Sequence, residues 1–431
     1  EYSHDMGNSN GNLKEFWDQW RTTPRIIGGA IWEFKDQGLL KKDADGTSYY
    51  AYGGDYGERY YDDFTIKGIV APDGRPKPAI YECKHVFQPA ECTLADAAQA
   101  TIHIKNWDGV SSLGEYDVVL QLREDGNVIL KKEIPHIDLP AGHDTTISIK
   151  KYLPVLKAGH EYLADIHFNL AQDEPWAQKG YEIAADQFAL TGLATPKVVS
   201  RGSKPAITKA NGQMVVSGKG FRISFNKEGA LASYLWNGKE QVFAPLMPHF
   251  TRPVTDNDHR GWKMEKKLAP WFNTGIKLTG MEQTQHGNLV EVHSSYSLID
   301  DSAKVNVIYT ISGSGEIKVD YQLKADPKLP DLPKVGMQMG ILRAYDQITY
   351  YGRGPYENYI DRNSGSETGI YSKPINEFME PYVVPQENGN RTDVRWMLLS
   401  AKNKEGLMVT ADSLLSMSAW PYTEQNIVAA K

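Results

Sequence analysis

The chain has 431 residues, a length that favours about three domains over one. Hydrophobic residues make up 41% and charged residues 23%, which is ordinary for a globular protein. The net charge of -7 argues against nucleic acid or an anionic membrane as the main partner, and no apolar run reaches the roughly 20 residues that span a bilayer.

The first eleven residues combine a carboxylate, a tyrosine, a histidine and a run of small turn-forming residues. This mixture just ahead of a helix is typical of the loops that follow barrel strands and carry catalytic groups. Glu1 at the end of such a strand would be a nucleophile, with Tyr2 to orient it and His4 to contact a polar substrate. The alternative is a surface glutamate at a frayed end.

Residues 12–20 predict an amphipathic helix, because apolar residues recur at i, i+3, i+4 and i+7: Leu13, Phe16, Trp17 and Trp20. Asn12 and Glu15 match a capping box, and Pro24 ends the helix. Residues 26–32 follow as a short continuous apolar run, the pattern of a strand buried on both faces. Together these segments predict half of a β/α repeat.

Trp32 ends this predicted strand and would offer an apolar wall to a sugar ring; the alternative is a core residue. The stretch that follows, to about Tyr61, is rich in Gly, Tyr and Asp and predicts a long active-site loop. Its tyrosines suit carbohydrate binding or packing against a neighbouring domain equally well. Residues 73–78 form a turn cluster, and residues 79–87 predict a further helix.

Short alternating runs at regular spacing between residues 100 and 190 predict an immunoglobulin-like sandwich; the runs are residues 101–104, 116–122, 146–149 and 162–168. After a polar linker at residues 195–205, further runs predict a large double sheet: residues 214–216, 221–225, 290–292, 304–309 and 318–321. Cys83 and Cys92 lie nine positions apart, and we expect two reduced, buried thiols rather than a disulfide.

Three segments of the last region are dense in polar and turn-forming residues: 250–258, 350–362 and 381–391. We expect ordered polar loops held by internal hydrogen bonds. Their charged residues would then do no more than form ion pairs: Arg353, Glu357, Arg391 and Asp393. The histidines show no H-x-x-x-H spacing and the cysteines no C-x-x-C pair, so the sequence predicts no zinc site.

Seven motifs in one order carry a resemblance: E-Y-S-H-D-M-G-N-S-N-G, G-G-A-I-W-E-F-K-D-Q, A-Y-G-G-D-Y-G, R-P-K-P-A, F-T-R-P-V-T-D-N-D, Y-Y-G-R-G-P-Y-E-N-Y-I-D-R and P-Q-E-N-G-N-R-T-D-V-R-W. Together they resemble the large bacterial β-galactosidases of glycoside hydrolase family 2. The resemblance covers nearly the whole chain but only the second half of such an enzyme.

The resemblance implies a multidomain, mainly β fold. Residues 1–88 would be the C-terminal part of a (β/α)8 catalytic barrel. Residues 89–196 would form an immunoglobulin-like β-sandwich. Residues 197–431 would form the antiparallel β super-sandwich of the galactosidase C-terminal domain, incomplete at its end.

The resemblance also implies hydrolysis of terminal β-D-galactosides such as lactose, with retention of configuration. Two glutamates about 5 Å apart do this chemistry, one as nucleophile and the other as acid and then base. By resemblance Glu1 is the nucleophile, His4 contacts a galactose hydroxyl and Trp32 lies under the sugar. The acid/base glutamate belongs upstream, so we expect this chain to be inactive alone.

Two metal ions are implied by the resemblance. The magnesium ligands of the family lie upstream of this chain. For sodium, relatives use the backbone carbonyl of a phenylalanine, here Phe64, together with an asparagine three positions later. That second position is Lys67 in this sequence, and its ammonium group would compete with the cation.

The expected partners are a β-galactoside and the missing N-terminal half of the enzyme, with no nucleic acid and no membrane. Homo-oligomerisation and the compartment, bacterial cytoplasm or periplasm, stay open. A second function also stays open, that of a non-catalytic β-sandwich module that binds carbohydrate or scaffolds an assembly.

Overall fold

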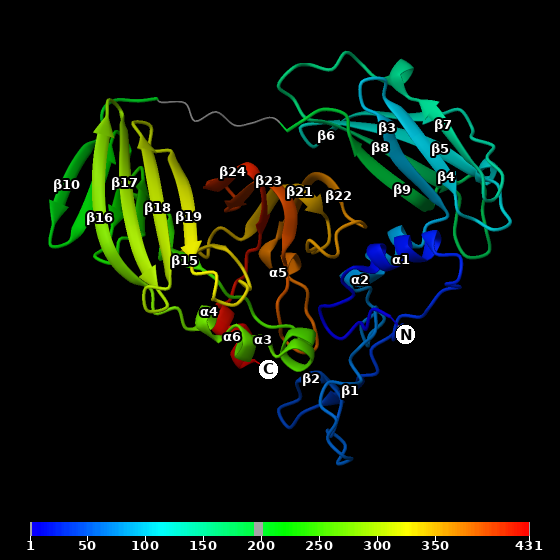
Figure 1. The fold of residues 1–431 in the computed structure, drawn as a ribbon, viewed down its shortest axis with the longest axis horizontal. Helices are drawn as coiled ribbons and strands as arrows, with labels where there is room; N and C mark the ends of the chain where they lie inside the picture. Colours follow the sequence, from blue (N-terminus) through cyan, green and yellow to red (C-terminus); the bar gives the residue numbers. More distant parts are fainter. Residues whose placement is uncertain (1, 194–200, 431) are drawn as a thin grey trace.

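The computed structural model describes residues 2–193 and 201–430, so Glu1 lies outside the described residues. The fold is mainly β, as predicted, with a small α/β part at the N-terminal end. Figure 1 shows this part beside an immunoglobulin-like sandwich, and a larger β region on the other side of the molecule.

Three short parallel segments organise the N-terminal part: residues 2–5, 30–36 and 67–70. Parallel bridges pair His4 with Trp32 and Lys35 with Val70. Backbone hydrogen bonds of about the same length connect the neighbours: Tyr2 to Ala30 at 3.1 Å, Asp5 to Trp32 at 3.2 Å and Val70 to Phe34 at 3.0 Å. Helix α1 (Leu13–Thr22) follows the first segment and α2 (Pro78–Val86) the third. Parallel segments alternating with helices are the pattern of a β/α barrel.

The predicted buried strand at residues 26–32 differs from the structure. Ile27 is fully exposed, and only the end of the run, at Trp32, makes a bridge. A strand buried on both faces needs covering layers on both sides. Here Ile31 packs against the buried cluster of Leu13 and Val70, whereas Ile27 meets solvent. The capping box is also absent, because Asn12 adopts φ 58° and its N–H donates to the Asp361 carbonyl at 2.6 Å. The helix predicted at residues 79–87 is confirmed.

The predicted active-site loop contains a hairpin of β1 (Leu39–Lys42) and β2 (Ser48–Ala51). Figure 1 shows this hairpin projecting from the lower end of the molecule. Its large side chains are exposed, including Leu39 at 61% and Leu40 at 66%. A two-stranded ribbon of this size is marginal in water without further packing.

Seven strands form the immunoglobulin-like part. One sheet holds β3 (Ala90–Asp96), β4 (Thr101–Asn106) and β7 (Asp144–Ser148); the other holds β6 (Asn127–Ile134), β5 (Tyr116–Glu124), β8 (Tyr162–Leu170) and β9 (Glu182–Ala189). Alternate residues of both sheets meet in the core, with Ile102 and Ile104 opposite Leu120 and Ile166 in one cluster. The two cysteines are free and buried, as expected. Turns of 3-10 type lie at Leu113–Glu115 and Lys150–Tyr152.

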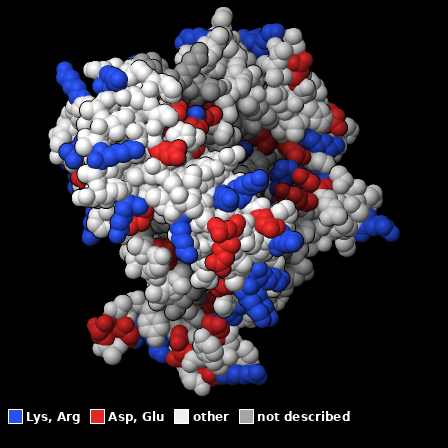
Figure 2. Space-filling model, turned by 60° about the vertical axis from the view of Figure 1, so that its left-hand side comes forward, with Lys and Arg blue, Asp and Glu red and all other residues white. Residues whose placement is uncertain are grey.

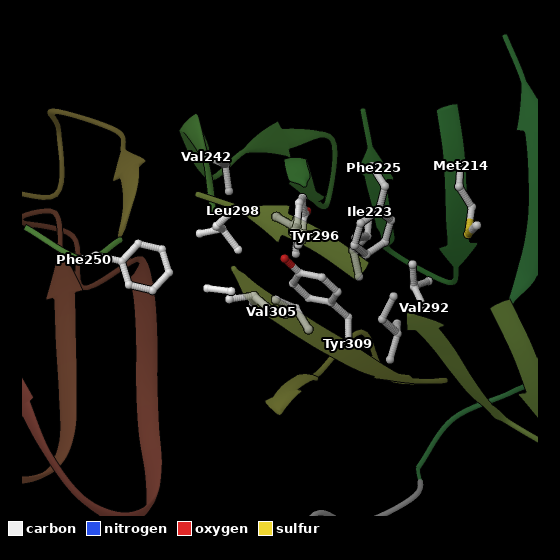
Figure 3. Close-up of a cluster of buried hydrophobic side chains, with 14 of the residues drawn as sticks. Met214, Ile223, Phe225, Val242, Phe250, Val292, Tyr296, Leu298, Val305 and Tyr309 are labelled. Atoms are coloured by element: carbon white, nitrogen blue, oxygen red, sulfur yellow. The ribbon is translucent and has the colours of Figure 1, made fainter. Parts of the chain in front are cut away.

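Two sheets face each other in the last region. The first holds β10 (Ala206–Ala210), β11 (Gln213–Gly218), β12 (Phe221–Phe225), β13 (Leu231–Trp236), β14 (Lys239–Glu240), β15 (Val242–His249) and β20 (Gly336–Ile341); the second holds β16 (Lys277–His286), β17 (Leu289–Leu298), β18 (Ala303–Ser312) and β19 (Ile317–Ala325). Figure 3 shows side chains of both sheets meeting in the core, and the Phe225 and Tyr309 rings lie 5.0 Å apart. The strand runs predicted here are confirmed.

A third sheet holds β22 (Glu367–Pro374), β21 (Gln347–Gly354), β23 (Arg391–Ser400) and β24 (Gly406–Met417). Figure 1 shows it at the centre of the molecule, between the double sheet and the immunoglobulin-like part. Helix α5 (Ile375–Phe378) contacts β21 and β22 of this sheet, whereas α3 (Met264–Lys267) and α4 (Ala269–Phe272) supply Met264 and Trp271 to the core of the double sheet. A π-helix lies at Asn257–Trp262, and α6 spans Glu424–Ala429. The domain boundaries predicted at residues 88 and 196 stay predictions.

Acidic and basic side chains lie interspersed on the face drawn in Figure 2. This distribution agrees with the modest net charge of -7. Within residues 2–193 and 201–430, no helix has the length and apolar character needed to cross a bilayer.

The double-sheet core gives a first test of the packing. Phe225 is fully buried against Tyr309, so Phe225→Ala should lower the free energy of unfolding by about 3–5 kcal/mol. The matched control is Val155→Ala, at a side chain 92% exposed, with an expected effect below about 0.5 kcal/mol. Urea unfolding of both variants measures the difference, and equal losses would contradict the assignment of the core.

Candidate active site

Three residues singled out above lie on neighbouring parallel segments. His4 pairs with Trp32 in a parallel bridge. The segment of Trp32 is joined to that of Lys67, because the Glu33 N–H donates to the Lys67 carbonyl at 2.7 Å. The ends of three successive barrel segments therefore come together, which is where barrel enzymes carry their sites. Glu1 directly precedes the first segment and lies outside the described residues.

Aromatic rings and one ammonium group surround this point. The rings of His4 and Phe64 lie 5.9 Å apart. The Lys67 Nζ lies 4.2 Å from the centre of the Phe64 ring and 5.6 Å from that of Trp32. About half of the Trp32 and Phe64 side chains is exposed, whereas Lys67 is 8% exposed. An exposed indole next to polar hydrogen-bonding groups suits a sugar, which has both an apolar face and hydroxyls.

Tyr2 lies on the side of helix α1. Its ring meets Trp20 edge-on at 4.2 Å and Phe16 at 5.9 Å. Burial raises the pKa of Tyr2 to about 12, and the neighbouring Cys83 thiol adds to the shift, so the phenol keeps its proton at neutral pH. The predicted contact of Tyr2 with substrate stays a prediction.

The expected sodium site does not fit the residues present. A sodium ion needs several oxygen ligands, but the group facing Phe64 is the buried ammonium of Lys67. Two cations at van der Waals separation repel strongly in a partly desolvated site. We therefore assign no step to sodium, and Phe64 contributes its ring to this surface.

A second candidate for a metal is the group of Asp165, His167 and Glu367, whose ligand atoms lie within 4.8 Å of one another. The Arg123 guanidinium already forms ion pairs with these carboxylates, at 2.7 Å from Asp165 and 3.0 Å from Glu367. Gln121 and Gln187 donate to the remaining lone pairs of Asp165 at 2.8 Å. The cluster is thus a satisfied ionic contact between the sandwich and the third sheet.

Buried charged groups lie next to the first parallel segment, residues 2–5. The Lys77 Nζ is 3.0 Å from a carboxylate oxygen of Asp36 and 4.0 Å from Asp5, which is completely buried. Burial raises the pKa of Asp5 to about 7, although the cations Lys77 and Arg362 oppose the shift. Sequence reasoning missed this group; its only signal was an acidic residue inside a run of small residues.

The loop after the motif is held by a distant arginine. Arg362 donates to the Ser9 carbonyl, to the Asn8 Oδ1 at 2.8 Å and to Glu357 at 3.1 Å. The Tyr382 hydroxyl also donates to Glu357. All of these groups are largely buried, so the guanidinium orders the loop while the carboxylate balances its charge.

Gln386 holds the same loop from another direction. Its side-chain oxygen accepts the Asn8 N–H at 3.0 Å, and its side-chain nitrogen donates to Asp256 at 2.9 Å. Gly7 has φ +63°, and a Cβ there would overlap the Gln386 amide. Glycine is thus required at this position both by backbone conformation and by the close approach.

The three polar loops predicted from composition are therefore ordered by hydrogen bonds and ion pairs. Arg353 pairs with Asp393, as expected. Glu357 pairs with Arg362, and Arg391 instead donates to backbone carbonyls, among them that of Pro355 at 3.2 Å. What composition did not reveal is that these loops hold the opening motif.

Comparisons with known proteins agree with this arrangement. Residues 1–92 match the sequence model "Glycosyl hydrolases family 2, TIM barrel domain", residues 102–191 match "Beta-galactosidase, domain 4" and residues 217–431 match "Beta galactosidase small chain". A β-galactosidase of Priestia megaterium is 33% identical over 98% of this chain, and one of Vibrio cholerae is 31% identical over 94%. A third, of Psychromonas ingrahamii, is 29% identical over the whole chain.

The three matches follow one another in the order barrel, sandwich and large β region, which defines a multidomain glycoside hydrolase. More narrowly, the chain belongs to the β-galactosidases of glycoside hydrolase family 2 and corresponds to their C-terminal half. It spans 41% of the length of the Priestia megaterium protein and 40% of the Vibrio cholerae protein.

Removal of the buried arginine should loosen the opening loop. Arg362→Gln would leave the Glu357 carboxylate buried without its cation and should lower the free energy of unfolding by about 3 kcal/mol. Amide exchange at Asn8 and Asn12 should become faster, because both N–H groups bond to this framework. The matched control is Lys239→Gln, which breaks an exposed pair with Glu405 and should cost less than about 1 kcal/mol. Unchanged exchange at Asn8 in the Arg362 variant would refute the holding role.

Asp5 gives a prediction about pH. Because its pKa is raised from 3.8 to about 7, the folded protein retains this proton over a range in which the unfolded chain loses it. Its contribution to the unfolding free energy is therefore full below about pH 4, falls as the pH rises to about 7, and then stays low. Asp5→Asn removes this ionisation, so the free energy of unfolding of the variant should rise relative to that of the wild type by on the order of 4 kcal/mol between these pH values. Urea unfolding at several pH values measures the difference, and a constant difference would rule the prediction out.

Proposed function

We propose that this chain is the C-terminal portion of a retaining β-galactosidase that hydrolyses terminal β-D-galactosides. One observation carries the proposal: His4 and Trp32 pair at the ends of two parallel barrel segments. The segment of His4 directly follows Glu1 in the sequence. A binding module has no need of a glutamate, a histidine and an exposed indole at this particular point of a barrel.

In this proposal Glu1 is the nucleophile. Its carboxylate attacks the anomeric carbon, the bond to the leaving oxygen breaks, and a galactosyl-enzyme ester forms. A carboxylic acid from the upstream half protonates the leaving oxygen and then, as a base, takes a proton from the water that cleaves the ester. Trp32 supports the apolar face of the sugar and His4 bonds to a hydroxyl. The magnesium ion of the family would be held by the upstream half.

Exposed apolar side chains of the N-terminal part support the proposed upstream partner. Its members are large side chains that lie open to solvent between residues 27 and 60: Ile27, Phe34, Leu39, Leu40 and Tyr60, exposed at 102%, 69%, 61%, 66% and 70%. Large apolar side chains exposed in such number are typical of a surface that another chain covers. The barrel segments that would cover it belong, by our proposal, to the missing half.

The second candidate is a non-catalytic module that binds carbohydrate or scaffolds an assembly. The immunoglobulin-like sandwich and the double sheet would suit such a role. This alternative does not explain why His4 and Trp32 lie side by side. It also does not explain the buried hydrogen bonds that hold the loop of residues 7–11.

Reconstitution separates the two functions. The chain, with and without a co-expressed upstream half of a family member, is assayed on a nitrophenyl β-galactoside. We expect cleavage only by the pair, because general acid catalysis alone is worth about 10²–10⁴-fold and in our proposal the acid comes from the upstream half.

Glu1→Gln is the matched control, since it keeps the size of the side chain and removes the nucleophile. In the pair it should abolish the formation of the galactosyl-enzyme. Activity of the isolated chain that disappears in Glu1→Gln would contradict the division of the site, and a reconstituted pair that cleaves no β-glycoside would favour the binding module.

A further inference from the structure

Lys67 is a buried cation whose described partners are aromatic faces. Its residue is 8% exposed, and its Nζ faces the rings of Phe64 and Trp32 at 4.2 Å and 5.6 Å. Its backbone is fixed by the Glu33 N–H. The ammonium is thus held at one place, between the exposed indole and the phenylalanine next to His4.

Aromatic faces stabilise a cation electrostatically, but they do not saturate its hydrogen-bonding capacity. An ammonium group has three N–H donors and no acceptor. Within residues 2–193 and 201–430, no side-chain oxygen accepts a hydrogen bond from the Lys67 Nζ, whose contacts are the Phe64 and Trp32 rings. A sugar hydroxyl lying on Trp32 is an acceptor of the right chemistry, and a hydrogen bond from a charged donor is stronger than a neutral one.

We propose that the Lys67 ammonium stands in place of the sodium ion expected from the resemblance and donates directly to a hydroxyl of the bound galactoside. The fixed charge of the side chain then supplies the positive charge of the site, and galactoside binding needs no sodium. The part that concerns the sugar depends on the proposed function; the replacement of the cation does not.

The test uses the reconstituted pair and compares NaCl with KCl at equal ionic strength. The wild-type KM for a nitrophenyl β-galactoside should be the same in both salts. Lys67→Met should raise KM about 10- to 100-fold in both salts with kcat little changed, since the lost bond serves ground state and transition state alike. Lys132→Met, which removes an ammonium 5.1 Å from the Tyr152 ring in the immunoglobulin-like part, is the matched control and should leave KM unchanged.

Lys67→Asn should make galactoside binding depend on sodium, because it removes the ammonium and provides an amide oxygen in its place. Its KM should fall at least about fivefold when KCl is replaced by NaCl. The proposal would be overturned by a wild-type KM that depends on sodium, by an unchanged KM in Lys67→Met, or by a Lys67→Asn variant indifferent to the salt.

Sodium-23 relaxation distinguishes failure of this inference from failure of the proposed function. If the pair cleaves no β-galactoside, the proposed function fails and the relaxation measurement decides the replacement alone. A saturable sodium signal with the wild-type protein would overturn the replacement. A signal that appears only with Lys67→Asn would support it.

Discussion

The contact on which the site depends joins the loop of residues 7–11 to Arg362, in the loop after β21. Arg362 donates to the carbonyl of Ser9 across 353 residues and to the Asn8 side chain across 354. A loop of small residues such as 7–11 has many conformations, and ordering it costs about 1–2 kcal/mol per residue. Arg362 and Gln386 provide directional bonds that select one conformation. The geometry of the barrel loop is therefore determined by the large β region and not by the barrel segments alone.

This arrangement places several charges in the interior, and two of the cations have carboxylate partners there. Arg362 is balanced by Glu357, and Lys77 lies between Asp36 and Asp5. Buried ion pairs contribute little net stability, because desolvation offsets much of their attraction. They instead fix positions, because a buried guanidinium whose acceptors are fixed has essentially one conformation that satisfies its N–H groups. Lys67 follows the same logic with aromatic rings as partners.

The immunoglobulin-like part is tied to the same framework. Glu161 accepts a bond from the Tyr351 hydroxyl at 2.5 Å and from Arg395 at 3.0 Å. Arg123 bridges Asp165 of the sandwich and Glu367 of the third sheet. The central sheet of β21–β24 thus bonds to the sandwich on one side, while the loop after β21 and the loop before β23 hold the barrel segment. All three parts of the chain share one polar network.

Local pattern was sufficient for the elements whose burial follows their own periodicity. The alternating runs of β4, β5 and β18 and the helix near residue 80 are where the sequence predicts them, because each buries one regular face. Strand β6 was missed, since its residues are mostly exposed and lack that alternation. The site residues were accessible only through the order of the seven motifs, and a lysine at position 67 was visible in the sequence as a departure from the family.

Tertiary structure decided what those residues do. Asn12 has the sequence of a helix cap, but the Asp361 carbonyl takes its N–H and its backbone turns left-handed. Residues 26–32 read as a buried strand, but burial depends on covering layers that no local pattern contains. The partners of Arg362, Gln386 and Lys67 come from distant segments, so their roles cannot be read from neighbouring residues. Sequence by itself determined the family, the elements with a regular buried face and the presence of a lysine at position 67. Only the fold decided which groups meet, because hydrogen bonds and charges act through space and not along the chain.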